Sequence, residues 1–329
     1  MNDSTLLLSR EDTKKCIDMR ACLEVVEQVF RAPGQGNGGM PPNLHLKMHP
    51  GAGWINAMPA YLVPQNAAGL KWVGGWEKNR EKGLPYIMAE TILIDAETGF
   101  LKSVMEGGYI TDLRTGAATG IAAKYLAKKN SKTAAIIGAG AQGRMQLRAL
   151  YQLFDLEEVR VADVSPQASR DFAKEMQDEL EISIRETKDP QQTVFEADII
   201  VTATTANEIL IKQGWVSKGA FIASIGSYPE IDPQIILSSN KIIVDSWEQS
   251  KHRGELSRLV QEGKIGEENI YGEVGEIVAG TKSGREAKDE IIIACLIGLG
   301  SHDIGCAHHV YKEAQKRRLG QTFSFQQST

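Results

Sequence analysis

Ala134-Ala135-Ile136-Ile137-Gly138-Ala139-Gly140-Ala141-Gln142-Gly143 is the stretch of this sequence that decides the predicted fold. A short apolar run enters a turn whose glycines have the spacing G-x-G-x-x-G, and apolar side chains then recur at helical intervals over 144–150. In such a turn the first glycine permits a tight bend, the second lets a pyrophosphate approach the backbone, and the third lets the helix pack closely on the strand. The N-terminus of the helix offers free N–H groups to phosphate.

The residues after this turn strengthen the interpretation, because a lone match is weak in a chain with 32 glycines. A second apolar run, 158–162, ends at Asp163, and this acid follows Gly143 by twenty residues. An acid at that distance binds the adenosine ribose hydroxyls and disfavours a 2′-phosphate. The sequence therefore predicts NAD as the cofactor, with NADP possible. The alternative is a glycine turn without a ligand beside a surface aspartate.

Composition and charge exclude several classes of protein. With 329 residues the chain is long enough for two domains. A net charge of −5 gives no reason to expect nucleic acid or an anionic membrane as a partner. No apolar run is long enough to span a bilayer, and the N-terminus lacks the basic region of a signal peptide. The four cysteines have no metal-site spacing, Cys16 and Cys22 are expected on one helix, and free thiols indicate a cytoplasmic location.

The chain alternates between apolar strands and helices from 132 to about 300, which predicts a doubly wound parallel sheet covered on both faces. Before it, a helix is expected from the N-cap Ser9 to about Arg31, followed by a strand-rich segment, a helix over 110–127 and a boundary at Lys128–Ser131. The final helix, 302–319, is expected to pack back on the N-terminal part. Candidate strands of the sheet are 133–138, 158–162, 182–185, 198–202, 220–225, 241–245 and 291–295, and its clearest helices are 141–153, 166–180 and 190–196.

Small polar residues end two of the expected strands. The run Asp198–Thr204 ends in Thr202-Ala203-Thr204, and the next strand ends in Ser224-Ile225-Gly226. Because the carboxyl ends of parallel strands line the cofactor crevice of such a sheet, both ends are expected to contact the cofactor.

Motifs along nearly the whole chain resemble those of the ornithine cyclodeaminase/μ-crystallin family, with the closest likeness to its alanine dehydrogenase and ketimine reductase members. The matching stretches keep their order in the chain. They are Ala57-Met58-Pro59-Ala60-Tyr61, Gly69-Leu70-Lys71-Trp72-Val73, Lys82-Gly83-Leu84-Pro85, Thr111-Asp112-Leu113-Arg114-Thr115-Gly116-Ala117-Ala118, Ile137–Gln142, Ala197–Thr202 and Gly272-Glu273-Val274-Gly275-Glu276-Ile277.

The resemblance implies an architecture and a reaction. An α+β substrate-binding and dimerisation domain, 1–130 plus 302–329, would hold an inserted Rossmann domain, 131–301. Family members transfer hydride between NAD(P) and the α-carbon of an amino or imino acid, so a small amino or imino acid and a second copy of the chain are the expected partners.

The resemblance also implies site residues. Lys71 and Asp303 would be catalytic, Arg114 and Lys71 would hold the substrate carboxylate, and His45 and Asn56 would complete the substrate site. Asp303 has an alternative reading as a plain helix N-cap, and Lys71 and Arg114 could be surface charges beside Glu90 or Asp112. No metal site is expected. The implied cofactor contacts are Thr115, Gly138, Gly140, Ala141, Gln142, Gly143, Asp163, Thr202, Ala203, Thr204, Ser224, Ile225 and Gly226.

The sequence departs from the family pattern at three places. Cyclodeaminases carry an aspartate shortly after the Ile-Gly pair that corresponds to Ile225-Gly226, whereas here Glu230 and Asp232 could replace it only if the loop folds back. Asn43 follows Pro41-Pro42 where related members have a lysine, and Asn56 stands where a basic residue is common. Deaminating cyclisation of ornithine is therefore the weaker alternative, and a non-catalytic crystallin-like binder of NAD(P) is another.

Overall fold

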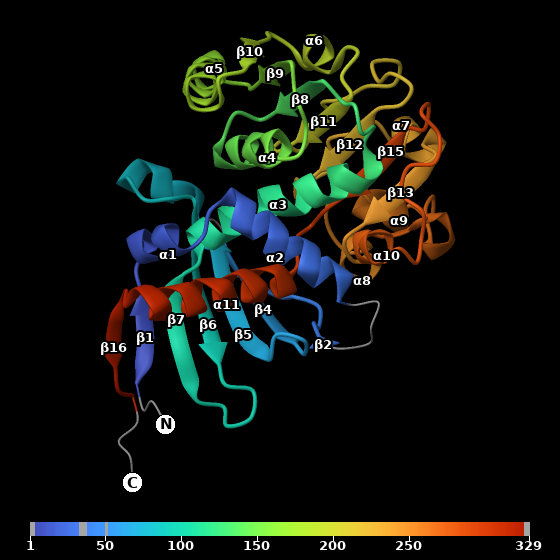
Figure 1. Cartoon of the computed structure of the whole chain (residues 1–329). Coiled ribbons are helices and arrows are strands. Elements are labelled where there is room, and N and C mark those ends of the chain that lie inside the picture. Colours follow the sequence, from blue (N-terminus) through green and yellow to red (C-terminus); the bar gives the residue numbers. More distant parts are fainter. Residues whose placement is uncertain (1–3, 33–37, 50–51, 326–329) are drawn as a thin grey trace. The chain divides into compact units, whose positions relative to one another are not determined.

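The structure, a computed structural model, describes residues 4–32, 38–49 and 52–325. The chain forms two compact units (Figure 1). The first, here called the split unit, contains Met1–Arg114 and Leu299–Thr329, and the second, the inserted unit, contains Thr115–Gly298.

The boundaries of these units differ from the expected 130/131 and 301/302. The first lies sixteen residues earlier, inside helix α3 (Gly108–Leu126), and the second three residues earlier. The physical reason is that α3 is a continuous helix of 19 residues. The polar run Lys128–Ser131 follows the end of this helix. The boundary between the two units lies near the start of the helix, where the sequence pattern shows no break.

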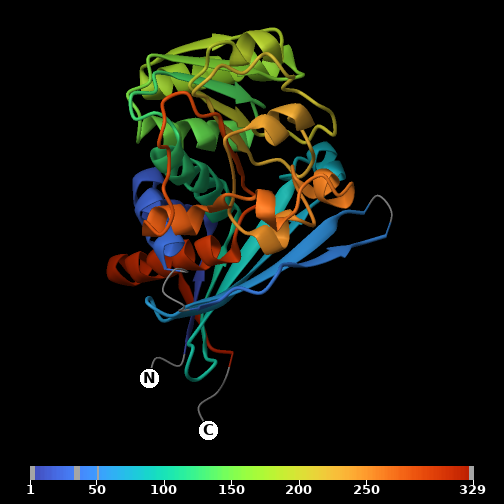
Figure 2. The same ribbon diagram turned by 90° about the vertical axis from the view of Figure 1, so that its right-hand side faces the viewer.

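The split unit is a mixed sheet of eight strands in the order β16-β1-β7-β6-β5-β4-β2, with β3 also paired to β4. Helices α2 and α11 lie side by side across one face of this sheet, in front of the strands in Figure 1 and to their left in Figure 2. The predicted return of the last helix onto this part is confirmed. The elements are β1 (Thr5–Leu8), α1 (Arg10–Cys16), α2 (Met19–Arg31), β2 (Gly38–Gly39), β3 (Leu44–Lys47), β4 (Trp54–Leu62), β5 (Ala67–Gly75), η2 (Glu77–Lys82), β6 (Ile87–Ile94), β7 (Leu101–Glu106), α11 (Gly300–Arg317) and β16 (Gln321–Phe323).

The N-terminal helix differs from its prediction. Ser9 is the N-cap and forms the expected capping box with Asp12. The helix ends at Cys16, however, because Ile17 is extended and Asp18 caps a second helix by accepting the Ala21 N–H at 2.8 Å. The prediction of one helix to Arg31 is therefore wrong, as is the placement of Cys16 and Cys22 on the same helix. Of the Gly- and Pro-rich segment after Arg31, residues 33–37 lie outside the described residues.

The alternation of side chains along the strands decides which residues face the helices. In β4, β5 and β6 the buried positions include Asn56, Met58, Lys71, Val73 and Thr91. Met58 is opposite Lys71, and Lys71 is opposite Thr91. A lysine thus lies on the core face of a strand, where a charge is costly unless it is paired.

The inserted unit is a sheet of eight parallel strands in the order β10-β9-β8-β11-β12-β15-β13-β14. The chain runs outward from β8 to β10 and then returns to β11 beside β8, which places the topological switch point between β8 and β11. Its elements after α3 are β8 (Thr133–Ile137), α4 (Ala141–Tyr151), β9 (Glu158–Ala162), α5 (Pro166–Leu180), β10 (Ser183–Glu186), α6 (Pro190–Val194), β11 (Ile199–Thr202), β12 (Phe221–Ser224), α7 (Pro233–Ser238), β13 (Lys241–Val244), α8 (Trp247–Ser250), α9 (Ser257–Gln261), η3 (Glu267–Asn269), β14 (Gly272–Glu273), α10 (Val274–Ala279) and β15 (Ile292–Cys295).

Two features are absent from the described residues. Every described helix is too short or too polar to span a lipid bilayer. Among the same residues, no group of three or more His, Cys, Asp or Glu side chains is placed to hold a metal ion.

Candidate functional site

The glycine turn of the inserted unit has the geometry that its spacing predicts. Gly138 has φ +108°, and a Cβ there would lie 2.5 Å from the Ala203 carbonyl oxygen. A Cβ on Gly143 would lie 2.1 Å from the carbonyl oxygen of Gly138, so only glycine lets α4 pack on β8. At Gly140 a Cβ would meet nothing within 4 Å. Open space over Gly140 fits the close approach of a pyrophosphate to the backbone.

The start of α4 and the end of β9 complete this half of the cofactor site. The N-cap Gly140 gives no side-chain cap, so the N–H groups at Ala141 and Gln142 lie where a phosphate would accept them. Asp163 accepts the Ala139 N–H through Oδ2 and the Ser165 N–H through Oδ1, both at 2.9 Å. These two bonds hold Asp163 against the turn. Because a carboxylate offers about four lone-pair sites, Asp163 can still accept hydrogen bonds from the ribose hydroxyls.

Arg144 was not among the residues expected from the sequence. Its Nη1 donates to the carbonyl oxygens of Ala139 and Gly140, and its Nε donates to Glu175 at 2.7 Å. The arginine therefore holds the turn in shape from behind. The only signal in the sequence was a basic residue directly after Gly143, and this signal does not distinguish Arg144 from an exposed helix residue.

The predicted cofactor residues on β11 and β12 lie at the carboxyl ends of these strands, but their hydroxyls point elsewhere. The Ser224 hydroxyl donates to Glu255 at 2.9 Å, and the Thr204 hydroxyl is hydrogen-bonded to Glu230. Thr202 is fully buried close to Glu230, whose pKa is raised by burial against the opposing effect of the Thr204 and Thr202 hydroxyls. Of the remaining predicted contacts, Ala203, Ile225 and Gly226 follow the same two strands, and Thr115 follows Arg114 in α3.

Three charged side chains of the split unit meet beneath α11. The carboxylate of Asp303, in the first turn of this helix, lies between two cations from β5 and α3. Its Oδ2 is 2.8 Å from Lys71 Nζ, and its Oδ1 accepts a hydrogen bond from Arg114 Nε at 3.0 Å. Lys71 and Asp303 are each 0% exposed. The reading of Asp303 as an N-cap is wrong, because Leu299 holds that position, and neither cation is a surface charge.

The charges of this triad stabilise one another. Burial alone would raise the pKa of Asp303, but Arg114 and Lys71 outweigh burial and hold this pKa below its ordinary value. Asp303 is therefore a carboxylate at neutral pH. Burial and then the charge of Arg114 lower the pKa of the neighbouring His302 to about 3, so this imidazole is neutral and packs edge-on against Phe30 at 4.3 Å.

Arg114 uses only part of its guanidinium in the bridge to Asp303. Nε is used on Asp303, and within the described residues the two terminal nitrogens form no hydrogen bond. These nitrogens form a fork that fits the two oxygens of a carboxylate. The Asp303 bond fixes the direction of this fork, which is the pre-organisation that a substrate-carboxylate site needs.

His45 and Asn56 form a second polar pair in the split unit. They are opposite each other on β3 and β4, and Nδ1 of His45 lies 2.7 Å from Oδ1 of Asn56. An amide oxygen can only accept, so Nδ1 of His45 carries the proton. The pair thus brings together two of the predicted substrate residues, in place of the basic residue that is common in the family.

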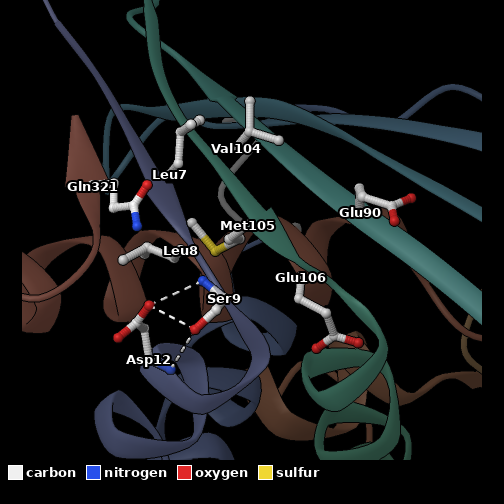
Figure 3. A pocket seen from close by; sticks show the side chains of 9 residues that line it. All are labelled: Leu7, Leu8, Ser9, Asp12, Glu90, Val104, Met105, Glu106 and Gln321. Carbon is white, nitrogen blue, oxygen red and sulfur yellow. Dashed lines mark hydrogen bonds between the residues drawn. The ribbon is translucent and has the colours of Figure 1, made fainter. Parts of the chain in front are cut away.

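A surface hollow of about 450 Å³ in the split unit lies apart from these residues (Figure 3). Ser9 and Asp12 in its wall are bonded to each other as the capping box of α1. Glu106 accepts the N–H groups of Gly108 and Tyr109 at the start of α3. These polar groups already have structural partners, so the hollow is not a candidate active site. Its lining residues are Leu7, Leu8, Ser9, Asp12, Glu90, Val104, Met105, Glu106 and Gln321.

The two acids that could have replaced the aspartate of cyclodeaminases are both used inside the inserted unit. Asp232 caps α7 through the Gln234 N–H at 2.9 Å. The loop after Gly226 does fold back, and Glu230 Oε2 would lie 2.6 Å from a Cβ on Gly226, but this side chain is fully buried and bonded to Thr204. Neither acid is thus placed to act on a departing amine.

Comparison with known proteins gives relatives that match nearly the whole chain. The sequence is 40% identical over 325 residues to the alanine dehydrogenase of Archaeoglobus fulgidus, which covers 98% of each chain. The solved structure of Δ1-pyrroline-2-carboxylate reductase from Thermococcus litoralis, in complex with NADH and L-proline, has a TM-score of 0.93 and 38% identity over 96% of this chain and 99% of that one. An archaeal alanine dehydrogenase dimer with bound NAD has a TM-score of 0.93 and 40% identity, over 98% and 99%.

These matches confirm the predicted fold class, a Rossmann sheet inserted in an α+β unit. Since the relatives are a dehydrogenase of an amino acid and a reductase of a cyclic imino acid, the predicted class of reaction, hydride transfer at a CH–NH or CH–NH2 group, is also confirmed. The sequence profile of the ornithine cyclodeaminase/mu-crystallin family matches residues 3–318. The chain belongs to the ornithine cyclodeaminase/mu-crystallin family.

Proposed function

We propose that the protein is an NAD-dependent oxidoreductase that interconverts a small α-imino acid and the corresponding α-amino acid. The observation that carries this proposal is the Asp303 bridge. It holds Lys71 and Arg114 together and leaves the terminal nitrogens of Arg114 for a substrate carboxylate. The relatives that resemble the chain over its whole length act on alanine and on a cyclic imino acid, which supports a short or cyclic substrate side chain.

The roles of the residues follow from their charges. Arg114 binds the substrate carboxylate through its fork, and Lys71, paired with Asp303, gives a proton to the imine nitrogen and takes it back in the reverse direction. The positive charge on that nitrogen makes the α-carbon a better hydride acceptor. Bound NADH supplies the hydride. His45 and Asn56 line the substrate side of the same sheet face and contribute hydrogen-bonding groups.

The inserted unit has the features that NAD requires. The open space over Gly140, the uncapped N-terminus of α4 and the carboxylate of Asp163 fit the pyrophosphate and the adenosine ribose. Val164 follows Asp163 and is fully exposed, whereas sites for NADP use an arginine in this neighbourhood. NAD is thus favoured over NADP.

A homodimer is proposed through the sheet face of the split unit that α2 and α11 do not cover. This face carries Leu44 and Leu46, which are 72% and 55% exposed; Leu44 is in register with Ala57 and Trp72, and Leu46 with Ile55. Exposed apolar rows of this kind are typical of protein interfaces. The archaeal alanine dehydrogenase that resembles the chain is a dimer. A cytoplasmic location and the absence of a nucleic-acid partner stay predictions.

The experiment that tests this function is a substrate screen at constant NADH. Purified protein is given either Δ1-pyrroline-2-carboxylate or pyruvate with ammonia, and NADH oxidation is followed by absorbance. Turnover of one of them, abolished in Arg114→Ala with NADH binding retained, is the expected result. Ammonia release from ornithine without a net change in NADH would instead revive cyclodeamination. Tight NADH binding without turnover of any imine would contradict the enzymatic role proposed for Arg114 and Lys71.

A further inference from the structure

Two buried glutamates lie under the strand ends where one half of the cofactor crevice is built. Glu230 is fully buried and contacts the Thr204 hydroxyl, which in turn accepts the Ala206 N–H at 2.9 Å. Within the described residues, the second carboxyl oxygen of Glu230 has no hydrogen-bond partner, and it is packed against Gly226. Glu230 thus ties the loop after β11 to the loop after β12.

Glu255 holds the second of these loops from the other side. Its oxygens accept the Glu230 N–H at 3.0 Å, the Ile231 N–H at 3.0 Å and the Ser224 hydroxyl at 2.9 Å. Hydrogen bonds from several donors favour the charged form of a carboxyl group and oppose the effect of burial. By hydrogen-bond geometry Glu230 accepts from one side chain, the Thr204 hydroxyl, and the Thr202 hydroxyl lies close by. The geometry therefore assigns the negative charge to Glu255 and a proton to Glu230.

The electrostatics agree with one proton on the pair. Burial raises the pKa of Glu230, and burial with a contribution from the charge of Glu230 raises the pKa of Glu255 to about 7. For two carboxyls that interact, such a value describes the pair rather than either member. A charge on Glu230 raises the pKa of Glu255, so two carboxylates here repel, and one proton on the pair removes this repulsion.

The position of the pair gives it a consequence for the cofactor. Asp163 and the glycine turn take the adenosine and pyrophosphate at β8 and β9, so the nicotinamide half falls to the other half of the sheet, at β11 and β12. The loops that leave these two strands are the ones tied together by Glu230 and Glu255. The hydroxyls expected to contact the cofactor, those of Thr204 and Ser224, are instead directed into the pair.

We propose that Glu230 and Glu255 are positioning residues that share one proton and fix the two nicotinamide-side loops, so that these loops bind the nicotinamide through their backbone. This inference rests on NAD as the cofactor. It assigns a protonated carboxyl to Glu230 and a carboxylate to Glu255, and so predicts opposite responses to the same substitution. An amide mimics a protonated carboxyl at Glu230. At Glu255 an amide N–H2 must face one of the three donors.

The test compares Glu230→Gln with Glu255→Gln in the full-length protein at pH 7. NADH binding is measured by fluorescence titration without substrate, so the result does not depend on which imino acid is turned over. Glu230→Gln is expected to keep the wild-type Kd within about twofold, and Glu255→Gln is expected to raise it at least about tenfold. The infrared band of a buried protonated carboxyl should be present in the wild type and lost in Glu230→Gln.

The matched control is Glu290→Gln. Glu290 also accepts two backbone N–H groups, those of Glu286 and Ala287, and pairs with Lys241, but it lies at the amino ends of β13 and β15. This variant is expected to lower the melting temperature without changing the Kd for NADH. If Glu255→Gln also changes only the melting temperature, the pair is merely structural and the proposal fails.

A second variant covers the case in which Glu255→Gln does not fold. Thr204→Val removes the hydroxyl that links Glu230 to the loop after β11, and it should raise the Kd for NADH about threefold to tenfold, whereas Thr204→Ser should restore it. Equal Kd values for both, or an infrared band unchanged in Glu230→Gln, would overturn the proposal. Failure of the wild type itself to bind NADH would contradict the proposed function instead.

Discussion

Arg114 Nε lies 3.0 Å from Oδ1 of Asp303, while the other oxygen of the same carboxylate lies 2.8 Å from Lys71 Nζ. One anion from a helix near the end of the chain thus neutralises two cations from its first third. Removing a single partner from a buried group of this kind leaves an uncompensated charge, which costs much more than the group contributes when intact.

Asp303→Asn is therefore expected to destabilise the protein by about 3 to 5 kcal/mol and to abolish measurable turnover. The amide keeps the shape of the side chain but cannot balance Lys71 and Arg114. Chemical denaturation and steady-state kinetics measure the two effects. Asp112→Asn, which removes a carboxylate 3.7 Å from Arg10, is the control and should change stability by less than about 0.5 kcal/mol. Wild-type kinetics in Asp303→Asn would refute the role of the bridge.

Arg114→Lys tests the fork rather than the charge. A lysine retains a cation beside Asp303 but offers no pair of parallel donors to a carboxylate. We expect KM for the amino or imino acid to rise about 10- to 100-fold with the Kd for NADH unchanged. A parallel rise in the Kd for NADH would mean that Arg114 contacts the cofactor instead.

Asp163→Ser tests the choice of cofactor. The carboxylate repels a 2′-phosphate and accepts ribose hydroxyls, so its removal should improve kcat/KM for NADPH relative to NADH by at least about tenfold, or about 1.4 kcal/mol. Both cofactors are assayed with the same substrate. A wild-type protein that already prefers NADPH would contradict our reading of Asp163.

His302 gives a prediction for pH. Its folded-state pKa of about 3 lies below the ordinary value of 6.5 because burial and Arg114 disfavour the charged imidazole. The stability that neutral His302 contributes is present above pH 6.5 and is lost as the pH falls from 6.5 towards 3. Between pH 7 and 5 the wild type should lose about 2 kcal/mol that His302→Gln does not lose. Parallel losses in denaturation curves of the two proteins would show that His302 does not titrate on unfolding.

Leu46→Asp tests the proposed dimer face. A charge in the exposed row of Leu44 and Leu46 should convert a dimer to a monomer without lowering the melting temperature of the monomer itself. Sedimentation velocity measures the change. Val164→Asp places a charge at an exposed apolar residue of the other unit and serves as the control. An unchanged dimer in Leu46→Asp would exclude this face as the interface.

The sequence predicted the parts of the fold that local patterns determine. The turn at Gly138–Gly143, the strand ending at Asp163 and helix α5 were expected from spacing and periodicity, and the structure has them within a residue or two. Strand β1 was not expected, because Thr5–Leu8 is short and its partners are Leu101–Glu106 and Gln321–Phe323, both distant in the chain. Pairing over such separations leaves no local signal.

The candidate site shows the same division between what local patterns predict and what depends on packing between distant segments. Lys71, Arg114 and Asp303 were expected through family motifs, whereas the bridge between them depends on how α11 packs on the sheet. Glu230 and Glu255 were missed as a pair, because each looks like an ordinary surface acid in its own segment. Their burial arises only when loops from three strands meet. Because this burial leaves no local signal, Thr204 and Ser224 were expected to contact the cofactor, whereas their hydroxyls bond to the two glutamates.

The pairing of Thr5 with Phe323, at the edge of the split unit, has a consequence for synthesis on the ribosome. Strand β1 cannot pair with β16 until β16 has been synthesised, so the inserted unit can fold while the split unit is still incomplete. Asp303, which bridges Lys71 and Arg114, is also synthesised after both of them. A chain that stops before Asp303 therefore has the glycine turn and Asp163 but lacks the bridge between Lys71 and Arg114.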